Sequence, residues 1–253
     1  MPTYLLIAIL VLISASVGLN LYLLRKVHWV FRLAERIRSS NERQFRQLFR
    51  QLQLLHALEG QLALPKSLPP TGGKAGTPDF LKLVADHVLA AKPRLVIECG
   101  SGISTIVLAR CLQMNGAGHV FSMEHMPEFA NTTREQLSVQ GLFEWATVLD
   151  APLVTHSAQD QTFQWYRSAD LPEGPIDLLI VDGPPARTGA SPRYPAGPML
   201  FHRLSSNGTI VVDDARRPEE QAVIERWRKQ FAQFNFQTNF DDFQKGVCIA
   251  RRR

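Results

Sequence analysis

Three aspartates at the ends of two apolar runs carry the clearest chemical signal in this sequence. Asp182 directly follows the apolar run at 176–181, and Asp213 and Asp214 close the next one, at 208–213. If the two runs are neighbouring parallel strands, their carboxyl ends meet at one edge of a sheet and the three carboxylates share one mouth. Like charges in a cleft are costly unless a cation or a proton compensates them. Because Mg²⁺ prefers oxygen ligands, the pattern predicts a metal site.

A second interpretation of the same aspartates needs no metal. Asp182 would contact the cofactor or the substrate, while Asp213 and Asp214 would cap the helix that follows them. Arg216 and Arg217 come directly after the pair. They would either bind an acceptor or offset the negative charge of the acids, and the sequence leaves both interpretations open.

A glycine-rich turn is the second chemical feature. Its residues are Glu98, Cys99, Gly100, Ser101 and Gly102, and Ile103, Ser104 and Thr105 open the helix that follows. Two glycines let the backbone turn tightly and approach a ligand, and a helix start offers unpaired N–H groups. Glu124 ends the next apolar run, where a carboxylate accepts hydrogen bonds from ribose hydroxyls. The pattern suits a nucleoside cofactor, either NAD or S-adenosylmethionine.

Two residues of this turn favour S-adenosylmethionine. Thr105 stands where a dinucleotide fingerprint has its third glycine. Glu98 places a carboxylate that would repel a pyrophosphate and attract a cationic sulfonium ligand with a free amino group. A nicotinamide-dependent oxidoreductase is therefore the less favoured alternative.

A segment rich in proline and glycine, at 183–198, follows Asp182 directly. This position predicts a loop that faces the substrate. Its Arg187 and Arg193 would bind a carboxylate or phosphate of the acceptor, with Tyr194 beside them. The alternative is a solvated loop without a role in binding.

Strand-like and helix-like segments alternate along most of the chain. The predicted strands are 94–98, 119–123, 145–149, 176–181 and 208–213, and the predicted helices are 78–91, 103–114, 127–140, 195–205 and 218–233. This alternation predicts a mostly parallel sheet covered on both faces. Two last runs, 235–240 and 245–250, have no helix between them, which predicts a terminal hairpin and one antiparallel strand. Aromatic residues at 163, 165 and 166 would cover the acceptor site or pack under a loop.

Four blocks at these strand ends resemble one known family, the class I S-adenosylmethionine-dependent methyltransferases. The blocks are ECGSGIST at 98–105, MEH at 123–125, IVDGPP at 180–185 and VVDDARRPEE at 211–220. They are similar to a bacterial branch of the family, and the resemblance covers roughly residues 77–250. It implies an α/β, Rossmann-like, seven-stranded and mostly parallel sheet with an antiparallel last strand.

The resemblance also implies roles for individual residues. Those around the methionine moiety of the cofactor would be Glu98, Gly100, Ser101, Gly102, Ser104 and Thr105. Glu124 would hold the ribose, with His125 beside it, and Ala151 would lie near the adenine. The acids are similar to those of metal-dependent O-methyltransferases of the catechol type, in which Asp182, Asp213 and Asp214 would be catalytic and hold Mg²⁺. A metal there lowers the pKa of the acceptor hydroxyl. The lysine base of those enzymes is replaced by Pro185, so no base is assigned.

The chain begins with a candidate membrane anchor, residues 1–26. Residues 4–24 carry no charge and are long enough to cross a bilayer. Arg25 and Lys26 follow, so the positive-inside rule puts the N-terminus outside and the rest in the cytoplasm, as in a bacterial inner-membrane protein. A signal peptide or a buried helix is the alternative. The three cysteines suit free thiols in a reducing compartment.

The basic charge of the chain lies at its flanks. Residues 25–50 hold eight Lys/Arg and two acids, and three arginines end the chain, whereas residues 51–250 are net acidic. Nucleic-acid binding is therefore not predicted. Helical periodicity over 27–64 indicates a stalk that dimerises as a coiled coil, or an amphipathic helix that lies on anionic lipid or on its own domain. A linker at 65–77 would precede a domain at 78–253.

Together these features predict a membrane-anchored S-adenosylmethionine-dependent methyltransferase. Its acceptor would be a hydroxyl of a small molecule or of a glycan, with Mg²⁺ as a second hypothesised cofactor. A membrane scaffold that keeps the fold without catalysis is the alternative from another class.

Overall fold

The protein is described by a computed structural model that covers residues 2–73, 75–158 and 161–253. The chain divides into two compact units, one that ends at Arg50 and one from Gln51 to Arg253. The first unit is the N-terminal part of helix α1 (Thr3–Leu62). Leucine and isoleucine dominate its start, and this helix is long and apolar enough to cross a membrane by length and composition.

Seven strands of the second unit form one sheet, in the order β3-β2-β1-β6-β7-β9-β8. The strands are β1 (Leu95–Cys99), β2 (His119–Glu124), β3 (Ala146–Asp150), β6 (Ile176–Val181), β7 (Leu204–Val212), β8 (Phe234–Asn239) and β9 (Val247–Arg252). Neighbours from β3 to β7 pair in parallel, and β9 runs antiparallel to both β7 and β8. The predicted sheet with its reversed last strand is confirmed.

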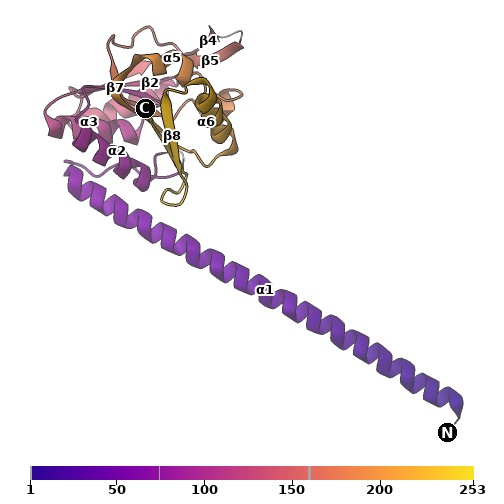
Figure 1. Cartoon of the computed structure of the whole chain (residues 1–253). Helices are drawn as coiled ribbons and strands as arrows, with labels where there is room; N and C mark the ends of the chain where they lie inside the picture. Colours follow the sequence, from indigo (N-terminus) through magenta and orange to yellow (C-terminus); the bar gives the residue numbers. More distant parts are fainter. Residues whose placement is uncertain (1, 74, 159–160) are drawn as a thin grey trace. The chain divides into compact units, whose positions relative to one another are not determined.

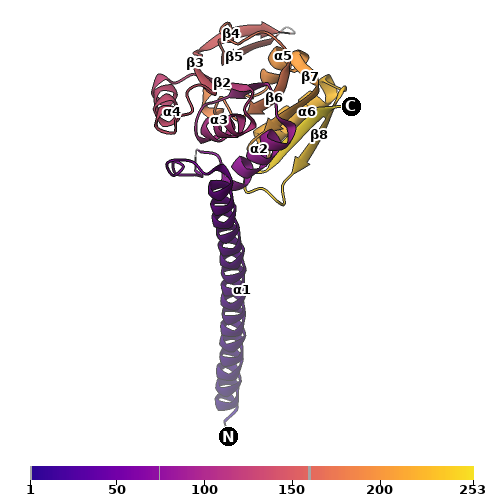
Figure 2. The same cartoon turned by 90° about the vertical axis from the view of Figure 1, so that its left-hand side faces the viewer.

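Helices cover both faces of this sheet. One face carries α2 (Pro78–Ala91), α3 (Ile103–Asn115) and α4 (Pro127–Val139), which lie in a row in Figure 2. The other carries α5 (Ala196–Leu200) and α6 (Pro218–Gln230) (Figure 1). Successive strand residues face opposite layers, so Leu178 and Ile180 belong to the first core, and Leu179 and Val181 to the second. Continuous apolar runs are what such a doubly covered sheet requires.

The structure differs from the sequence-based elements in two places. The helix expected at 195–205 consists of the short α5 and a 3₁₀ turn η2 (Phe201–Arg203), because β7 already begins at Leu204. An unexpected hairpin of β4 (Leu153–Ala158) and β5 (Gln161–Tyr166) follows β3. The β-branched and aromatic residues of these strands suit a hairpin, which buries Trp165 and Tyr166 completely.

The compact second unit begins well before residue 78. Leu58 and Leu62, at the end of α1, are fully buried in the core with α2 and α3. The amide of Gln51 donates to Asp79 at 2.7 Å and its oxygen accepts from the Asp79 N–H at 3.1 Å. The segment 65–77 is tied down as well, because Lys245 donates to the Ala75 carbonyl at 3.0 Å. The end of the predicted stalk and the predicted linker are therefore structural parts of the globular unit.

Candidate active site

The glycine-rich turn lies where parallel strands end side by side. Gly100 has a positive φ of 95°, and its N–H donates to the Met123 carbonyl at 2.9 Å. The Cys99 carbonyl accepts from the Asp182 N–H at 3.1 Å. A Cβ on Gly183 would lie 3.3 Å from the Gly100 Cα and 3.2 Å from the Cys99 carbonyl oxygen. The ends of β1 and β6 thus approach at a distance that leaves no room for a side chain at position 183.

A cavity of about 360 Å³ opens beside this turn and contains most of the predicted cofactor residues. The predicted ones that line it are Gly100, Ser101, Gly102, Ser104, Glu124 and His125. Glu98, Thr105 and Ala151 are buried and lie outside its lining. Of the predicted acids and substrate residues, the lining includes Asp182, Asp214, Arg187 and Arg193. Ala75, Gly76, Ile103 and Phe129 line the cavity as well, and apart from Ile103 no motif in the sequence indicates them.

Glu124 connects the turn to the end of β2. Its Oε2 accepts from the Ser101 N–H at 3.1 Å, and its Oε1 accepts from the N–H groups of His125 and Met126 at 2.8 and 3.0 Å. The His125 ring lies with Nδ1 2.9 Å from the same Oε1. The carboxylate is only 5 % exposed but faces the cavity. Its orientation is therefore set by the backbone before any ligand binds.

Glu98 and Thr105 hold the glycine-rich turn in place through hydrogen bonds. The Thr105 hydroxyl donates to Glu98 Oε2 at 2.5 Å and accepts from the Gly102 N–H at 3.0 Å. Glu98 is fully buried, and no described residue bonds to its Oε1. Burial raises the pKa of Glu98 to about 7, although the hydroxyls of Ser104, Thr105 and Ser122 stabilise its charged form. The threonine at the third-glycine position thus has a structural use in this turn.

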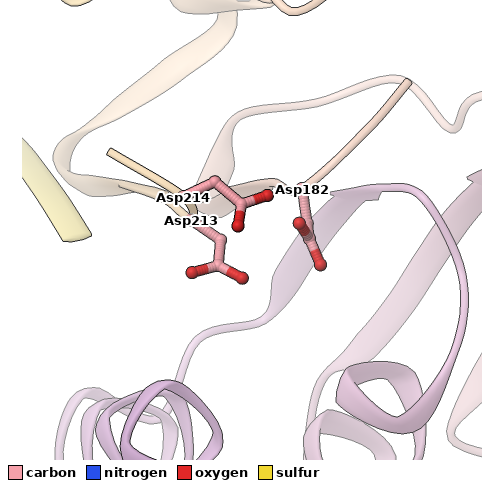
Figure 3. Close-up of side chains that lie close together, drawn as sticks. All are labelled: Asp182, Asp213 and Asp214. Atoms are coloured by element: carbon pink, nitrogen blue, oxygen red, sulfur yellow. The ribbon is translucent and has the colours of Figure 1, made fainter. Parts of the chain in front are cut away.

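The three aspartates of β6 and β7 come together as the sequence indicated. Asp213 and Asp214 follow the end of β7, and Asp182 follows the end of the neighbouring strand β6 (Figure 3). One carboxylate oxygen from each lies within 4.8 Å of those of the other two. Asp182 and Asp214 line the cavity, whereas Asp213 is buried beside it. The helix-capping interpretation does not fit, because the residue that precedes α6 is Arg217 and makes no side-chain cap.

Arg193 extends into the middle of this acidic group. Its side chain is 2 % exposed and its Nη2 donates to Asp182 Oδ1 at 3.1 Å and to Asp214 Oδ2 at 2.8 Å. Nη1 donates to the main-chain carbonyl of Asp213 at 2.8 Å. Nε lies 3.5 Å from Glu220 Oε1. The sequence had predicted Arg193 as an acceptor-binding residue, and the structure directs its guanidinium to the protein's own acids.

Burial controls the protonation of these acids. It raises the pKa of Asp182 to about 6 despite the adjacent Arg193 guanidinium. It also raises the pKa of Asp213 well above the usual range, and the charges of Asp182 and Asp214 act in the same direction. The pKa of Glu220 is raised for the same reason, although Arg193 opposes the shift. The raised pKa values mean that the charged forms of Asp182 and Asp213 are unfavourable in these surroundings. Nearby cations are needed to keep such carboxylates ionised.

The two other predicted substrate residues have different surroundings. Arg187 lies on the cavity wall and donates to the Met126 sulfur at 3.0 Å. Tyr194 is buried outside the lining, where its hydroxyl donates to Gln230 at 2.7 Å and its ring contacts Phe163. The structure thus leaves Arg187 available to an acceptor and uses Tyr194 in the core.

Tyr166, from the unexpected hairpin, also faces the cavity. Its side chain is fully buried, and its hydroxyl has no partner among the described residues. Burial raises the pKa of Tyr166 well above the usual range, so the hydroxyl stays protonated. The aromatic group at 163–166 was the only sequence signal for this position. Gly183, Pro185 and Arg217 complete the wall, two of them from the loop predicted at 183–198.

A seven-stranded sheet with this strand order, a reversed last strand and a glycine-rich turn after its first strand is the fold of the class I methyltransferases. Residues 97–215 match the family model described as a methyltransferase domain. The globular unit therefore has the fold of the class I methyltransferases and contains a match to a methyltransferase domain, as the sequence blocks indicated. A comparison with curated proteins finds no match.

Solved structures share this fold at low sequence identity. The SAH-bound methyltransferase PaMTH1 of Podospora anserina matches with a TM-score of 0.54 and 14% identity, over 79% of this chain and 88% of that one. An O-methyltransferase from Bacillus cereus in complex with SAH matches with a TM-score of 0.54 and 18% identity, over 79% and 91%. The O-methyltransferase TomG of Streptomyces achromogenes, in complex with SAM, gives 0.52 and 15%, over 79% and 89%.

Proposed function

We propose that this protein is a membrane-anchored enzyme that transfers the methyl group of S-adenosylmethionine to an acceptor hydroxyl. One observation carries the proposal. A single cavity joins a glycine-rich turn and Glu124 on one side to Asp182 and Asp214 on the other. Such a cavity holds a nucleoside cofactor at the first strands and an acceptor at the next ones, at the carboxyl ends of a parallel sheet.

The cofactor assignment rests on the residues that face the cavity. The backbone of Gly100, Ser101 and Gly102 offers N–H groups and close approach, and Glu124 is oriented to accept hydrogen bonds from ribose hydroxyls. The SAM and SAH that are bound to proteins of the same fold support this assignment. S-adenosylmethionine supplies an electrophilic methyl group, and the protein supplies position and electrostatics.

Asp182 is the carboxylate best placed to take the acceptor proton. Its side chain is 22 % exposed and lines the cavity, and no hydrogen bond within the described residues uses its Oδ2. In the transfer, the acceptor oxygen forms a bond to the methyl carbon as the carbon–sulfur bond breaks. The hydroxyl proton passes to Asp182, and the sulfonium becomes a neutral thioether. In-line approach within a closed site supplies much of such a rate increase.

Arg187 would direct the acceptor into this position. Its guanidinium lies on the cavity wall and suits a carboxylate or phosphate group of a small molecule or glycan. Helix α1 would anchor the chain in the membrane, with its apolar part in the bilayer and the basic residues 25–50 on the cytoplasmic side. We also propose that two copies of the chain associate through the exposed part of α1.

The decisive experiment is calorimetry with the full chain in detergent micelles, titrated with S-adenosylmethionine and, separately, with NAD. Binding of S-adenosylmethionine alone is expected. Absence of binding at millimolar concentration would instead favour a membrane scaffold, and binding of NAD alone would favour an oxidoreductase. Glu124→Ala removes the carboxylate proposed to bind the ribose, so it should weaken S-adenosylmethionine binding if the cofactor occupies this cavity. A radioactive methyl-transfer screen against membrane lipid and glycan extracts then identifies the acceptor.

Membrane topology needs its own test. A reporter enzyme that is active only outside the cytoplasm, fused after Arg253, is expected to be inactive, and the chain is expected to stay in the membrane fraction at alkaline pH. Activity of the reporter would contradict the proposed orientation, and release at alkaline pH would contradict the anchor.

A further inference from the structure

The guanidinium of Arg193 is surrounded by oxygen atoms, as a bound metal ion would be. Its guanidinium donates to the main-chain carbonyls of Asp182 and Asp213, both at 2.8 Å, and to side-chain oxygens of Asp182 and Asp214. These oxygens come from the ends of two adjacent strands, β6 and β7. Planar guanidinium suits such a set, because it directs several donors in fixed directions. The residue therefore joins the two strand ends that form the acceptor side of the cavity.

The same contacts already occupy one carboxylate oxygen of Asp182 and one of Asp214. By distance alone the three aspartates could hold an ion, since their oxygens lie within 4.8 Å of one another. However, Asp182 Oδ1 and Asp214 Oδ2 both accept from Arg193 Nη2, at 3.1 and 2.8 Å. Arg217 Nη1 lies 2.9 Å from the same Asp214 oxygen. A divalent ion bound by the remaining oxygens would lie next to this buried guanidinium and next to Arg217.

The charge around the site is also nearly balanced without an ion. Four carboxyl groups, those of Asp182, Asp213, Asp214 and Glu220, surround three cations, Arg193, Arg217 and Lys245. Lys245 Nζ lies 3.9 Å from Asp214 Oδ1. A doubly charged ion would add repulsion with a guanidinium that is 2 % exposed and poorly screened by water. The residues present therefore do not fit a divalent metal.

We propose that Arg193 is the built-in cation of this site and replaces the Mg²⁺ of the catechol-type methyltransferases, so that methyl transfer proceeds without a divalent metal. The statement about methyl transfer rests on the proposed function, whereas the role of Arg193 as the cation of the site does not. Arg193 acts as a positioning residue: it fixes the ends of β6 and β7 and turns the Asp182 carboxylate toward the cavity. Without a metal to chelate two oxygens, the acceptor needs only one hydroxyl group.

The first test measures metal binding directly. Mn²⁺ is added to the full chain in detergent micelles, with and without S-adenosylhomocysteine, and free Mn²⁺ is measured by electron paramagnetic resonance. We expect no stoichiometric binding at millimolar Mn²⁺, and methyl transfer that continues in excess chelator. One Mn²⁺ per chain at micromolar affinity, lost in Asp214→Asn, would overturn the proposal.

The second test removes the guanidinium. Arg193→Met keeps much of the side-chain volume but leaves the carboxyl groups without their central cation, so Tm should fall by roughly 10 °C. The variant is expected to gain Mn²⁺ binding, and millimolar Mn²⁺ should raise its Tm, an effect that loss of packing alone would not produce. Arg203→Met is the matched control, because Arg203 also donates to loop carbonyls but away from the site. It should gain no Mn²⁺ binding.

If Arg193→Met does not fold, a second variant, Arg193→Lys, still tests the proposal. Arg193→Lys keeps the charge but cannot reach all these oxygens, so it should have an intermediate Tm and bind no Mn²⁺. An Arg193→Lys or folded Arg193→Met variant with the Tm of the wild type would contradict the proposal. S-adenosylmethionine binding is measured in the same samples. Its absence in the wild type would refute the proposed function, while the Mn²⁺ result would still decide the role of Arg193.

Discussion

Gly183→Ala tests how closely the ends of β1 and β6 approach each other beside the cavity. The new Cβ would lie 2.4 Å from the hydroxyl oxygen of Tyr166, well inside the usual contact distance. The opposite direction is blocked too, because the Cys99 carbonyl oxygen would be at 3.2 Å and the Gly100 Cα at 3.3 Å. Relief therefore requires a movement of about 1 Å by Tyr166 or by the glycine-rich turn.

The cost of this movement follows from how firmly Tyr166 is held. Its ring is fully buried and packs edge-on against Trp165, with 5.0 Å between the ring centroids. Overpacking in such surroundings costs about 1–3 kcal/mol. For a domain of this size, Tm should fall by roughly 3–10 °C. A shift of about 1 Å in the turn should also lower the rate of methyl transfer by up to about 100-fold.

A second substitution separates the clash from other effects. Tyr166→Phe removes the hydroxyl that the alanine would meet, so Gly183→Ala in the Tyr166→Phe background should lose much less stability than in the wild type. Gly60→Ala is the matched control, because nothing lies within 4 Å of its added Cβ and alanine favours the helix by about 1 kcal/mol. Melting curves and calorimetry with S-adenosylmethionine measure all five proteins: the wild type, the three single variants and the double variant. A Gly183→Ala variant with wild-type Tm and affinity would refute the reasoning, and so would a double variant without recovery.

Three further predictions concern the cofactor side and the domain boundary. Glu124→Gln should weaken S-adenosylmethionine binding about 10- to 100-fold in calorimetry, because hydrogen bonds to a charged group are lost. Glu98 has a pKa of about 7 in the folded chain against an ordinary 4.5, so the folded state keeps a proton that the unfolded state loses. Stability should fall from about pH 4.5 to 7, by roughly 3 kcal/mol in all, and Glu98→Gln should remove that fall from the pH profile of Tm. A chain that begins at residue 65 should melt well below one that begins at residue 51, because it lacks Leu58 and Leu62, each worth about 2–5 kcal/mol.

Each of these predictions has a clear contrary result. Unchanged affinity in Glu124→Gln would remove this carboxylate from the cofactor site. A Tm difference between wild type and Glu98→Gln that is the same at pH 5 and pH 8 would show that the buried carboxyl does not titrate in this range. Equal melting of the two truncated chains would show that the end of α1 contributes nothing to the domain.

Local patterns were sufficient for much of the fold. The apolar runs predicted the central parallel strands, because strands buried on both faces, such as β1 and β6, must be apolar throughout. The reversed last strand followed from two runs without a helix between them. The β4–β5 hairpin was not predicted, since its residues alternate less clearly and it pairs only with itself. Likewise, nothing local indicated that Ala75 and Gly76 reach the cavity wall.

The sequence by itself determined which chemistry the site could contain. The glycine-rich turn, Glu124 and the three aspartates stand at strand ends, and parallel strands bring such ends together whatever the details of packing. Only the tertiary structure decided how the aspartates are compensated. Three acids in one cleft require a cation or a proton, and several arginines are near them in sequence, but the choice of Arg193 depends on the path of the loop after β6. Charge pairing between residues far apart in the chain leaves no periodic pattern, so it becomes visible only when the strands are in place.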